Sequence, residues 1–208
     1  MREKEEKRLE LLKEYEKKLY EKGVKYIAGI DEAGRGPLAG PVVVGVVIMK
    51  PESFIEGIND SKKISESKRE ALYKKITDEA IAWSTGIINE DEIDEINILN
   101  ATKKALTEAI SKLSVKPELI LVDALEKIDT NSIPYTSIIK GDAKIYSISC
   151  ASIIAKVTRD RIMRTYGKLY PEYGFESHKG YGTAKHIEAI KQYGLCPIHR
   201  RSFTKHFV

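Results

Sequence analysis

The sequence predicts an α/β fold in which a mixed five-stranded sheet is flanked by helices and followed by a small C-terminal helical cap. Short apolar runs rich in Val and Ile alternate with longer segments of helical periodicity, in the order strand, strand, helix, strand, helices, strand, strand, helices. The chain has 208 residues, 42% of them hydrophobic, which is enough for one sizeable core. It contains no internal repeat or low-complexity stretch, so we expect one main domain with a small appendage.

The N-terminal part should contain a helix and two strands. Residues 2–22 are highly charged, and their apolar side chains fall along one helical stripe: Leu9, Leu12, Tyr15 and Leu19. Residues 24–30 and 41–49 are rich in Val, Ile and Gly and predict two strands joined by the turn EAGRGPLAG. The stripe on the helix is suited either to packing on the body or to docking a partner, and the sequence does not distinguish the two.

The middle of the chain should supply a helix, a strand and further helices. Residues 65–80 predict a helix, and Ser67 and Glu70 have the spacing of a capping box at its start. Residues 80–89 predict the third strand. Apolar residues at helical spacing over 89–113 predict the helices that follow.

The remaining elements complete the sheet and form the cap. A largely apolar run over residues 118–125 predicts a buried strand that ends at Asp123, and residues 133–140 predict a short fifth strand. A long helix should follow within residues 141–171, where Pro171 ends it. We expect a last helix capped by Thr183 and ended by Gly194, and then an irregular tail.

Composition excludes several classes of protein. The chain lacks an apolar run long enough for a membrane span, and its first residues lack the apolar core of a secretory signal. Cys150 and Cys196 are far apart and have no metal-binding spacing, so we expect two buried thiols and neither a disulfide framework nor a zinc site. These features predict a cytoplasmic protein with no membrane partner.

Positive charge is concentrated at the C-terminal end. Residues 140–208 contain 13 Lys and Arg against 5 Asp and Glu, a surplus of +8, whereas the rest of the chain has 22 against 26, or −4. Such a surplus attracts phosphate backbones. An ordinary solvated surface explains the charge equally well, so charge alone decides nothing.

Acidic residues recur at the points where predicted strands end. Asp31 and Glu32 directly follow one apolar run, Asp123 ends another, and Asp142 lies where a strand gives way to a helix. If these strands are neighbours, the four acids converge, repel one another and raise their pKa values until a cation relieves the repulsion. Oxygen ligands without Cys or His favour Mg²⁺ or Mn²⁺, and a pair of such ions suits phosphodiester hydrolysis. A lone Asp at a strand end is more often a cap or turn former.

Several long motifs resemble those of the bacterial ribonuclease HII family. They cover residues 24 to about 203 in the family's order: DEAGRGPLAGP, DSKK, LVDAL, KGDAKIYSISCASIIAKVTRDR, HKGYGT and HRRSF. The resemblance implies a ribonuclease H-like sheet and a site of four acids, which fall on Asp31, Glu32, Asp123 and Asp142. It implies hydrolysis of RNA in RNA–DNA hybrids and incision 5′ to ribonucleotides embedded in duplex DNA, by two-metal-ion in-line hydrolysis that leaves 5′-phosphate and 3′-hydroxyl ends.

The resemblance also assigns residues to the substrate. It implies that Gly34, Arg35 and Gly36 contact the ribonucleotide, and glycines would allow this loop to approach the 2′-hydroxyl closely. It implies that Tyr181 packs at the RNA-to-DNA step. Taken alone, the glycine loop is typical of a tight turn, and a tyrosine is typical of a partly buried core residue.

Other polar residues have weaker signals. Ser61, Lys62 and Lys63 are suited to gripping a phosphate, but DSKK is equally typical of a solvated turn. Lys156, Arg159 and Arg164 lie on a predicted helix near acids, so a structural role is at least as well supported. Three histidines have no metal-like spacing, and we expect them to form hydrogen bonds: His178, His186 and His199.

The sequence predicts three regions and leaves two rivals. We expect a charged helical extension over residues 1–22, a ribonuclease H-like catalytic domain over 23–165 and a helical substrate-binding region over 166–208, acting as a monomer. Ribonuclease HIII shares the fold but typically has GKG in place of GRG and a large N-terminal domain. A non-catalytic nucleic-acid-binding module would not need all four acids.

Overall fold

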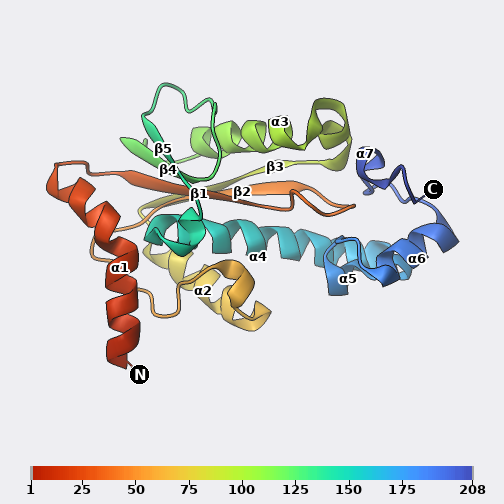
Figure 1. Cartoon of the computed structure of the whole chain (residues 1–208), viewed down its shortest axis with the longest axis horizontal. Coiled ribbons are helices and arrows are strands. Elements are labelled where there is room, and N and C mark those ends of the chain that lie inside the picture. The colour runs from red at the N-terminus through yellow and green to blue at the C-terminus, as the bar shows by residue number, and fades with distance from the viewer. Residues whose placement is uncertain (1, 208) are drawn as a thin grey trace.

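The structure, a computed structural model, describes residues 2–207 and has a five-stranded sheet at its centre (Figure 1). The strands are β1 (Ile27–Ala33), β2 (Val42–Ile48), β3 (Ala82–Ile88), β4 (Leu119–Asp123) and β5 (Tyr135–Ile138). Their order across the sheet is β3-β2-β1-β4-β5. β1 pairs antiparallel with β2, as β2 does with β3, whereas β4 lies parallel to both β1 and β5. The predicted mixed sheet is confirmed.

Helices cover both faces of this sheet and form a cap beyond one end of it (Figure 1). The helices are α1 (Arg2–Glu21), α2 (Glu66–Glu79), α3 (Glu90–Ser111), α4 (Tyr146–Leu169), α5 (Phe175–His178), α6 (Ala184–Tyr193) and α7 (Arg201–Thr204). Three short 3₁₀ turns are η1 (Ser61–Lys63), η2 (Gly141–Ala143) and η3 (Pro171–Tyr173). In Figure 1, α3 lies over one face, α4 runs along the other, and α2 packs beneath α4.

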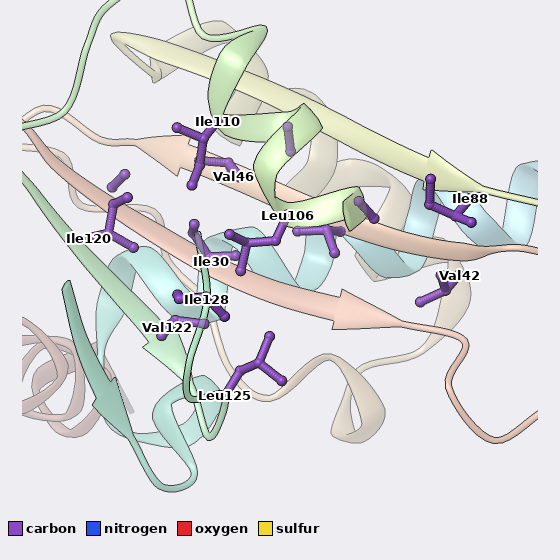
Figure 2. Close-up of a cluster of buried hydrophobic side chains, with 14 of the residues drawn as sticks. Ile30, Val42, Val46, Ile88, Leu106, Ile110, Ile120, Val122, Leu125 and Ile128 are labelled. Atoms are coloured by element: carbon purple, nitrogen blue, oxygen red, sulfur yellow. The ribbon is translucent and has the colours of Figure 1, made fainter. Parts of the chain in front are cut away.

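The largest apolar cluster lies between the sheet and α3. Figure 2 shows Ile30, Val46 and Ile120 from the strands meeting Leu106 and Ile110 from the helix. All seven residues of β2 are buried, because helices cover the strand on both faces. Removal of this apolar surface from water is the main stabilising contribution to the fold.

Helix α4 approaches the sheet more closely than side chains normally allow. A Cβ atom on Gly29 would lie 2.2 Å from the carbonyl carbon of Ser147, so a larger residue in β1 would push the helix away. This contact matters for the site, since β1 and α4 both carry polar residues toward it. Any residue larger than glycine at position 29 should therefore disturb the relative placement of these two elements.

The C-terminal part forms a separate, small core at the far end of α4 from α1 (Figure 1). Its buried members come from the turn after β1, from α4 and from the cap: Ala39, Met163, Tyr173, Phe175, Ala189 and Ile198. Thr183 caps α6, accepting a bond from the backbone of His186, and Gly194 ends the helix, as predicted. The tail is less irregular than predicted, because Asp94 of α3 accepts bonds from the backbone of Arg201 and Ser202 and thereby caps α7.

The N-terminal helix packs on the body, one of the two alternatives that its stripe left open. Leu9 and Leu12 are buried in an apolar cluster with residues of α2 and α4. Lys13 donates to the carbonyls of Pro51 and Ser53. Within the stripe only Tyr15 is largely exposed.

Two local predictions were wrong. The side chain that caps α2 is Ser65, which accepts from the backbone of Lys68, rather than Ser67. Strand β1 runs from residue 27 to 33, three residues later than predicted, so Asp31 and Glu32 lie within the strand and not after its end. Continued pairing with β2 explains the difference, because Asp31 faces Gly45 in the register and Glu32 faces Val44. Within residues 2–207, no helix is both long and apolar enough to cross a membrane.

Candidate active site

Three acids reach the site from three separate elements. Asp31 lies on β1, and Asp123 ends β4, its parallel neighbour. Asp142 lies in η2, directly after β5 and before α4. Because Ile30 pairs with Val122, the residues that follow them, Asp31 and Asp123, lie at the same level of the sheet.

The three carboxylates form one cluster. One oxygen from each of Asp31, Asp123 and Asp142 lies within 4.8 Å of the others. Glu32 is not in this group of three, although it follows Asp31 directly. Its carboxylate is 3.5 Å from the guanidinium of Arg35, so it forms an ion pair with a residue of the glycine loop.

Burial makes negative charge costly in this cluster. The pKa of Asp31 is raised well above its usual value, first by burial and then by the nearby charges of Glu32 and Asp123. The nearby hydroxyl of Ser152 and a hydrogen bond from the backbone N–H of Glu32 act in the opposite direction and lower the pKa of Asp31.

The neighbouring acids are shifted in the same direction. Burial raises the pKa of Glu32, and the charge of Asp123 adds to the shift, while Arg35 opposes it. Burial and the charge of Asp142 raise the pKa of Asp123, although its carboxylate accepts a 2.6 Å bond from the backbone of Gly141. The mutual repulsion of these carboxylates therefore favours the binding of a cation at the cluster.

One lysine faces this negative charge. The ammonium of Lys62 lies 3.9 Å from Asp142, and its side chain is 81% exposed. Burial acts to lower the pKa of Lys62, but the charges of Asp142 and Asp31 outweigh it and the pKa is raised. A flexible, exposed ammonium compensates for only part of the negative charge of the three carboxylates, so the donor set fits a hard divalent cation such as Mg²⁺ or Mn²⁺.

The residues on either side of Lys62 are placed differently. The side chain of Ser61 is buried, and its hydroxyl lies 2.8 Å from that of Ser152. It therefore points into the protein, away from a phosphate in solution. Lys63 is exposed and lies 3.8 Å from Asp60.

The glycine loop is held from the C-terminal end of the chain. Gly34 has a φ of +100°, which favours glycine, and its carbonyl accepts a 2.6 Å bond from the guanidinium of Arg200. The same guanidinium donates to the carbonyls of Arg35 and Gly40. The Arg35 side chain stays exposed, and a Cβ on Gly36 would meet open space, so this side of the loop is accessible.

A second buried arginine joins the loop to the segment that carries Tyr181. Arg159 donates to the carbonyls of Pro41, Ala39 and Lys179, and its guanidinium lies 5.9 Å from the ring centroid of Tyr181. The Tyr181 ring is 45% exposed. The fold thus brings the turn that follows the glycine loop and this exposed ring into contact with one buried guanidinium.

The remaining candidates have structural roles. Lys156 forms an ion pair with Asp160, and Arg164 pairs with Glu66 and Glu70 of α2, so part of the basic surplus is neutralised within the protein. Arg159 is likewise buried. Of the two roles that the sequence left open, the ion pairs and hydrogen bonds of these residues favour the structural one.

The three histidines form a stacked, hydrogen-bonded cluster. The rings of His178 and His186 stack at 4.5 Å, and the Nε2 atoms of His186 and His199 lie 3.0 Å apart. Burial lowers the pKa of both His186 and His199 to about 4. Neutral, hydrogen-bonded rings are what we expected of these residues.

Sequence reasoning missed two residues that hold the site together. Arg200 lies in the motif HRRSF, which carries no local sign of its role, yet its guanidinium holds the carbonyl of Gly34 from 166 positions away. Ser152 lies on a helix whose small and apolar residues are typical of core packing. A polar residue within such an apolar segment is the only signal in the sequence.

Comparison with known proteins identifies the relatives of this chain. The family model of ribonuclease HII matches residues 28–206. The ribonuclease HII of Acetivibrio thermocellus is 61% identical over 194 residues, which cover 93% of this chain and 75% of the relative. The ribonuclease HII of Clostridioides difficile is 56% identical over 207 residues, 99% of this chain and 80% of the relative.

Solved structures agree with this similarity. The ribonuclease H2 of Pyrococcus horikoshii has a TM-score of 0.72 at 32% identity and covers 88% of this chain and 98% of its own. The Archaeoglobus fulgidus ribonuclease HII, solved in complex with PCNA, has a TM-score of 0.72 at 26% identity, over 86% of this chain and 94% of its own. A Bst ribonuclease HIII in complex with Mn²⁺, at 16% identity and a TM-score of 0.63 over 82% of this chain and 63% of its own, shares the fold.

Proposed function

The chain belongs to the ribonuclease HII family and is a type 2 ribonuclease H, and from this premise we propose its substrates and mechanism. It hydrolyses RNA in RNA–DNA hybrids and incises duplex DNA 5′ to an embedded ribonucleotide, leaving 5′-phosphate and 3′-hydroxyl ends. One observation carries the proposal: three carboxylates from separate elements, two of them buried and that of Asp123 half-buried, have oxygens within 4.8 Å of one another, beside the loop of Gly34, Arg35 and Gly36.

The acids are the ligands of the cofactor in this proposal. Asp31, Asp123 and Asp142 hold Mg²⁺ or Mn²⁺, and Glu32, next to them, completes a set with enough oxygen atoms for two ions. When bound, such ions neutralise charge on the scissile phosphate and make water a stronger nucleophile. The Mn²⁺ complex of the Bst ribonuclease HIII supports this choice of metals.

The neighbouring residues position the nucleic acid. Lys62, exposed and 3.9 Å from Asp142, contributes positive charge for a backbone phosphate. The accessible side of the loop around Gly36 contacts the ribose and senses its 2′-hydroxyl, which distinguishes RNA from DNA. Tyr181 presents an exposed ring for stacking at the RNA-to-DNA step.

We extend the proposal to the organisation of the enzyme. The ligands come from one chain, which supports action as a monomer. The substrate is chromosomal DNA or RNA paired with it, which supports a cytoplasmic location. Residues 23–165 supply all four acids, and residues 166–208 supply Tyr181 and the arginine that holds the glycine loop, in keeping with a catalytic region followed by a substrate-binding region.

The test is cleavage of a defined duplex. A labelled DNA duplex with one internal ribonucleotide is incubated with Mg²⁺, with Mn²⁺ or with EDTA, beside an all-DNA duplex and an RNA–DNA hybrid. We expect a single nick 5′ to the ribonucleotide that requires the cation, and no cutting of the all-DNA duplex. Binding without cleavage would instead identify a non-catalytic nucleic-acid-binding module.

A further inference from the structure

One buried arginine contacts both segments that the proposed function assigns to substrate selection. Arg159 of α4 is only 1% exposed. Its guanidinium donates to the carbonyls of Ala39, Pro41 and Lys179 over distances of 2.9 to 3.0 Å. The first two carbonyls belong to the turn that follows the glycine loop, and the third belongs to the turn that carries Tyr181. One planar group therefore joins two segments that are far apart in the sequence.

The glycine loop itself lies directly against this side chain. A Cβ atom on Gly34 would be 2.2 Å from the Nε atom of Arg159. Three hydrogen bonds hold the guanidinium, so it has no freedom to move aside for a larger residue. The carbonyl of Gly34 is held separately, by a 2.6 Å bond from Arg200. The place of the loop relative to α4 is therefore set by its contact with Arg159.

The ring of Tyr181 lies against the same guanidinium. The centre of the Arg159 guanidinium is 5.9 Å from the ring centroid, a distance at which a cation and an aromatic face attract each other. The residue is 45% exposed, so part of the ring remains open for a base. Next to it in the chain, the carbonyl of Gly180 accepts a 2.8 Å bond from the N–H of Leu38. A shift of the ring relative to the glycine loop would therefore disrupt contacts of Arg159.

We propose that Arg159 is a positioning residue that sets the separation between the glycine loop and the ring of Tyr181. The loop then reaches the ribose while the ring stacks on the neighbouring base of the same duplex. This inference rests on the proposed function and names the residue that determines its selectivity for an RNA-to-DNA step. Arg159 is too buried to contact nucleic acid, so it acts through Gly34 and Tyr181.

A purely structural role and a positioning role predict different effects of mutation. The planar guanidinium has donors at fixed angles, which allows it to bond to three carbonyls at once. Arg159→Lys keeps the positive charge near the ring but has a single nitrogen, so it loosens the bonds that fix the distance. A structural role predicts lower stability with unchanged selectivity, whereas a positioning role predicts altered selectivity in the folded molecules.

The experiment measures selectivity as a ratio within one preparation. We determine kcat/KM for a duplex with one internal ribonucleotide and for a uniform RNA–DNA hybrid, and their ratio does not depend on the fraction of folded enzyme. The proteins are wild type, Arg159→Lys, Tyr181→Ala and the double variant. Arg164→Lys is the matched control, because it makes the same change on α4, where the guanidinium pairs with Glu66 and Glu70 of α2.

A second measurement follows the ring without any cleavage. The deoxynucleotide that follows the ribonucleotide is replaced by 2-aminopurine, whose fluorescence reports stacking, and the duplex is bound by saturating protein in EDTA. We expect wild type to change this fluorescence and Tyr181→Ala to abolish most of the change. Arg159→Lys should also lose most of it. Arg159→Gln, which retains two N–H donors and no charge, replaces the lysine variant if that protein does not fold, and the same loss is expected.

We expect Arg159→Lys to lower the preference for the ribonucleotide-containing duplex by about 3- to 10-fold, up to the factor of about 10 expected for loss of stacking on Tyr181. In the Tyr181→Ala background, the same change should alter the preference by less than about 2-fold, because both residues act through one contact. Arg164→Lys should match wild type in both measurements.

An unchanged preference in Arg159→Lys, whatever its Tm, would overturn the proposal and leave a purely structural arginine. Equal losses in the wild-type and Tyr181→Ala backgrounds would also overturn it, because Arg159 would then act independently of the ring. The fluorescence measurement requires no cleavage. A wild-type chain that fails to cut the duplex would therefore refute the proposed function while this test of Arg159 still stands.

Discussion

Asp31 shows how a functional group can work against the stability of the fold that carries it. Its carboxylate is buried, lies in a strand and has like charges nearby, and its pKa is raised. A raised carboxyl pKa means that its contribution to stability declines as the pH rises above the unfolded value. A packing role gives no reason to keep such a group, but a cation that binds there does.

Asp31→Asn should therefore lose function and gain stability. We expect kcat/KM on the ribonucleotide-containing duplex to fall by at least about 100-fold, because a metal ligand is neutralised. In EDTA at pH 8, Tm should rise above that of wild type. Asp78→Asn, which neutralises an exposed aspartate of α2, is the control and should change neither quantity. Undiminished cleavage by Asp31→Asn would refute the assignment of this residue.

Tyr181 combines an exposed ring with a fixed backbone. Its N–H donates to the carbonyl of His178, and its own carbonyl accepts from Thr183 and interacts with His186. We expect Tyr181→Ala to reduce cleavage at the RNA-to-DNA junction by about 10-fold, since stacking on an aromatic ring contributes ~1–3 kcal/mol per base.

The fold should tolerate the same change. An exposed substitution usually alters the free energy of unfolding by no more than ~0.5 kcal/mol. Comparison of kcat/KM for the junction duplex and for a uniform RNA–DNA hybrid, together with Tm, measures both effects. An unaltered preference for the junction would show that Tyr181 is not part of substrate selection.

Hydrogen bonds between elements that are far apart in sequence fix the conformation of the site. The loop between β1 and β2 carries Gly34 and Gly40, and its conformation depends on Arg200, which precedes α7. Arg159 of α4 holds the next part of the same turn through Pro41 and Ala39. The C-terminal cap therefore stabilises the loop through Arg200, and it also presents the exposed ring of Tyr181.

Arg200→Met should test this support. The change leaves three buried or part-buried carbonyls without a donor, and each unsatisfied group costs ~1–3 kcal/mol. We expect the free energy of unfolding, measured by urea denaturation, to fall by about 3 kcal/mol or more, with a loss of cleavage. Arg201→Met, the same change at the adjacent exposed position, is the control. Equal stability of the two variants would contradict the supporting role.

The molecule as a whole contains buried groups whose effects on stability have opposite pH dependence. His186 and His199 have pKa values of about 4, below the usual value near 6.5, because burial disfavours their charged forms. Glu16 of α1 is buried, and burial raises its pKa to about 7. Its carboxylate accepts a 3.4 Å bond from the backbone of Ser147 at the start of α4.

The histidine pair should make the fold sensitive to acid. The unfolded chain takes up protons at these positions below about pH 6.5, whereas the folded chain resists until about pH 4. The free energy of unfolding should therefore decrease between these values, by up to about 1.4 kcal/mol per pH unit for each histidine. Urea denaturation at half-unit steps measures this slope. In His186→Gln the slope should be shallower, and an equal slope would show that other groups are responsible.

Glu16 should act in the opposite direction. Because its folded pKa lies above its unfolded value, its contribution to stability is complete near pH 4.5 and is lost as the pH rises toward 7. Glu16→Gln should unfold at a higher urea concentration than wild type at pH 8, and the difference should vanish or reverse at pH 5. A variant less stable at both pH values would show that the charged carboxylate is needed at the start of α4.

Much of this protein could be predicted from the order of its residues. Apolar periodicity located the five strands and the major helices, because it reflects which faces are buried. The acids at or near strand ends predicted a cluster of Asp31, Glu32, Asp123 and Asp142, and the structure brings the three aspartates together but leaves Glu32 outside that group. These features could be predicted because each depends on a few neighbouring residues or on the general rule that adjacent strands share an edge.

Contacts between distant segments were decided only by the tertiary structure. The direction of Ser61 into the core, the hold of Arg200 on Gly34 and the continuation of β1 through Asp31 each depend on a partner elsewhere in the chain. A local sequence pattern predicts whether a residue is buried, but it does not predict which distant polar group will form its hydrogen bond. The sequence by itself therefore determined which chemical groups the site contains, and the packed chain determined which of them face the substrate and which hold the others in place.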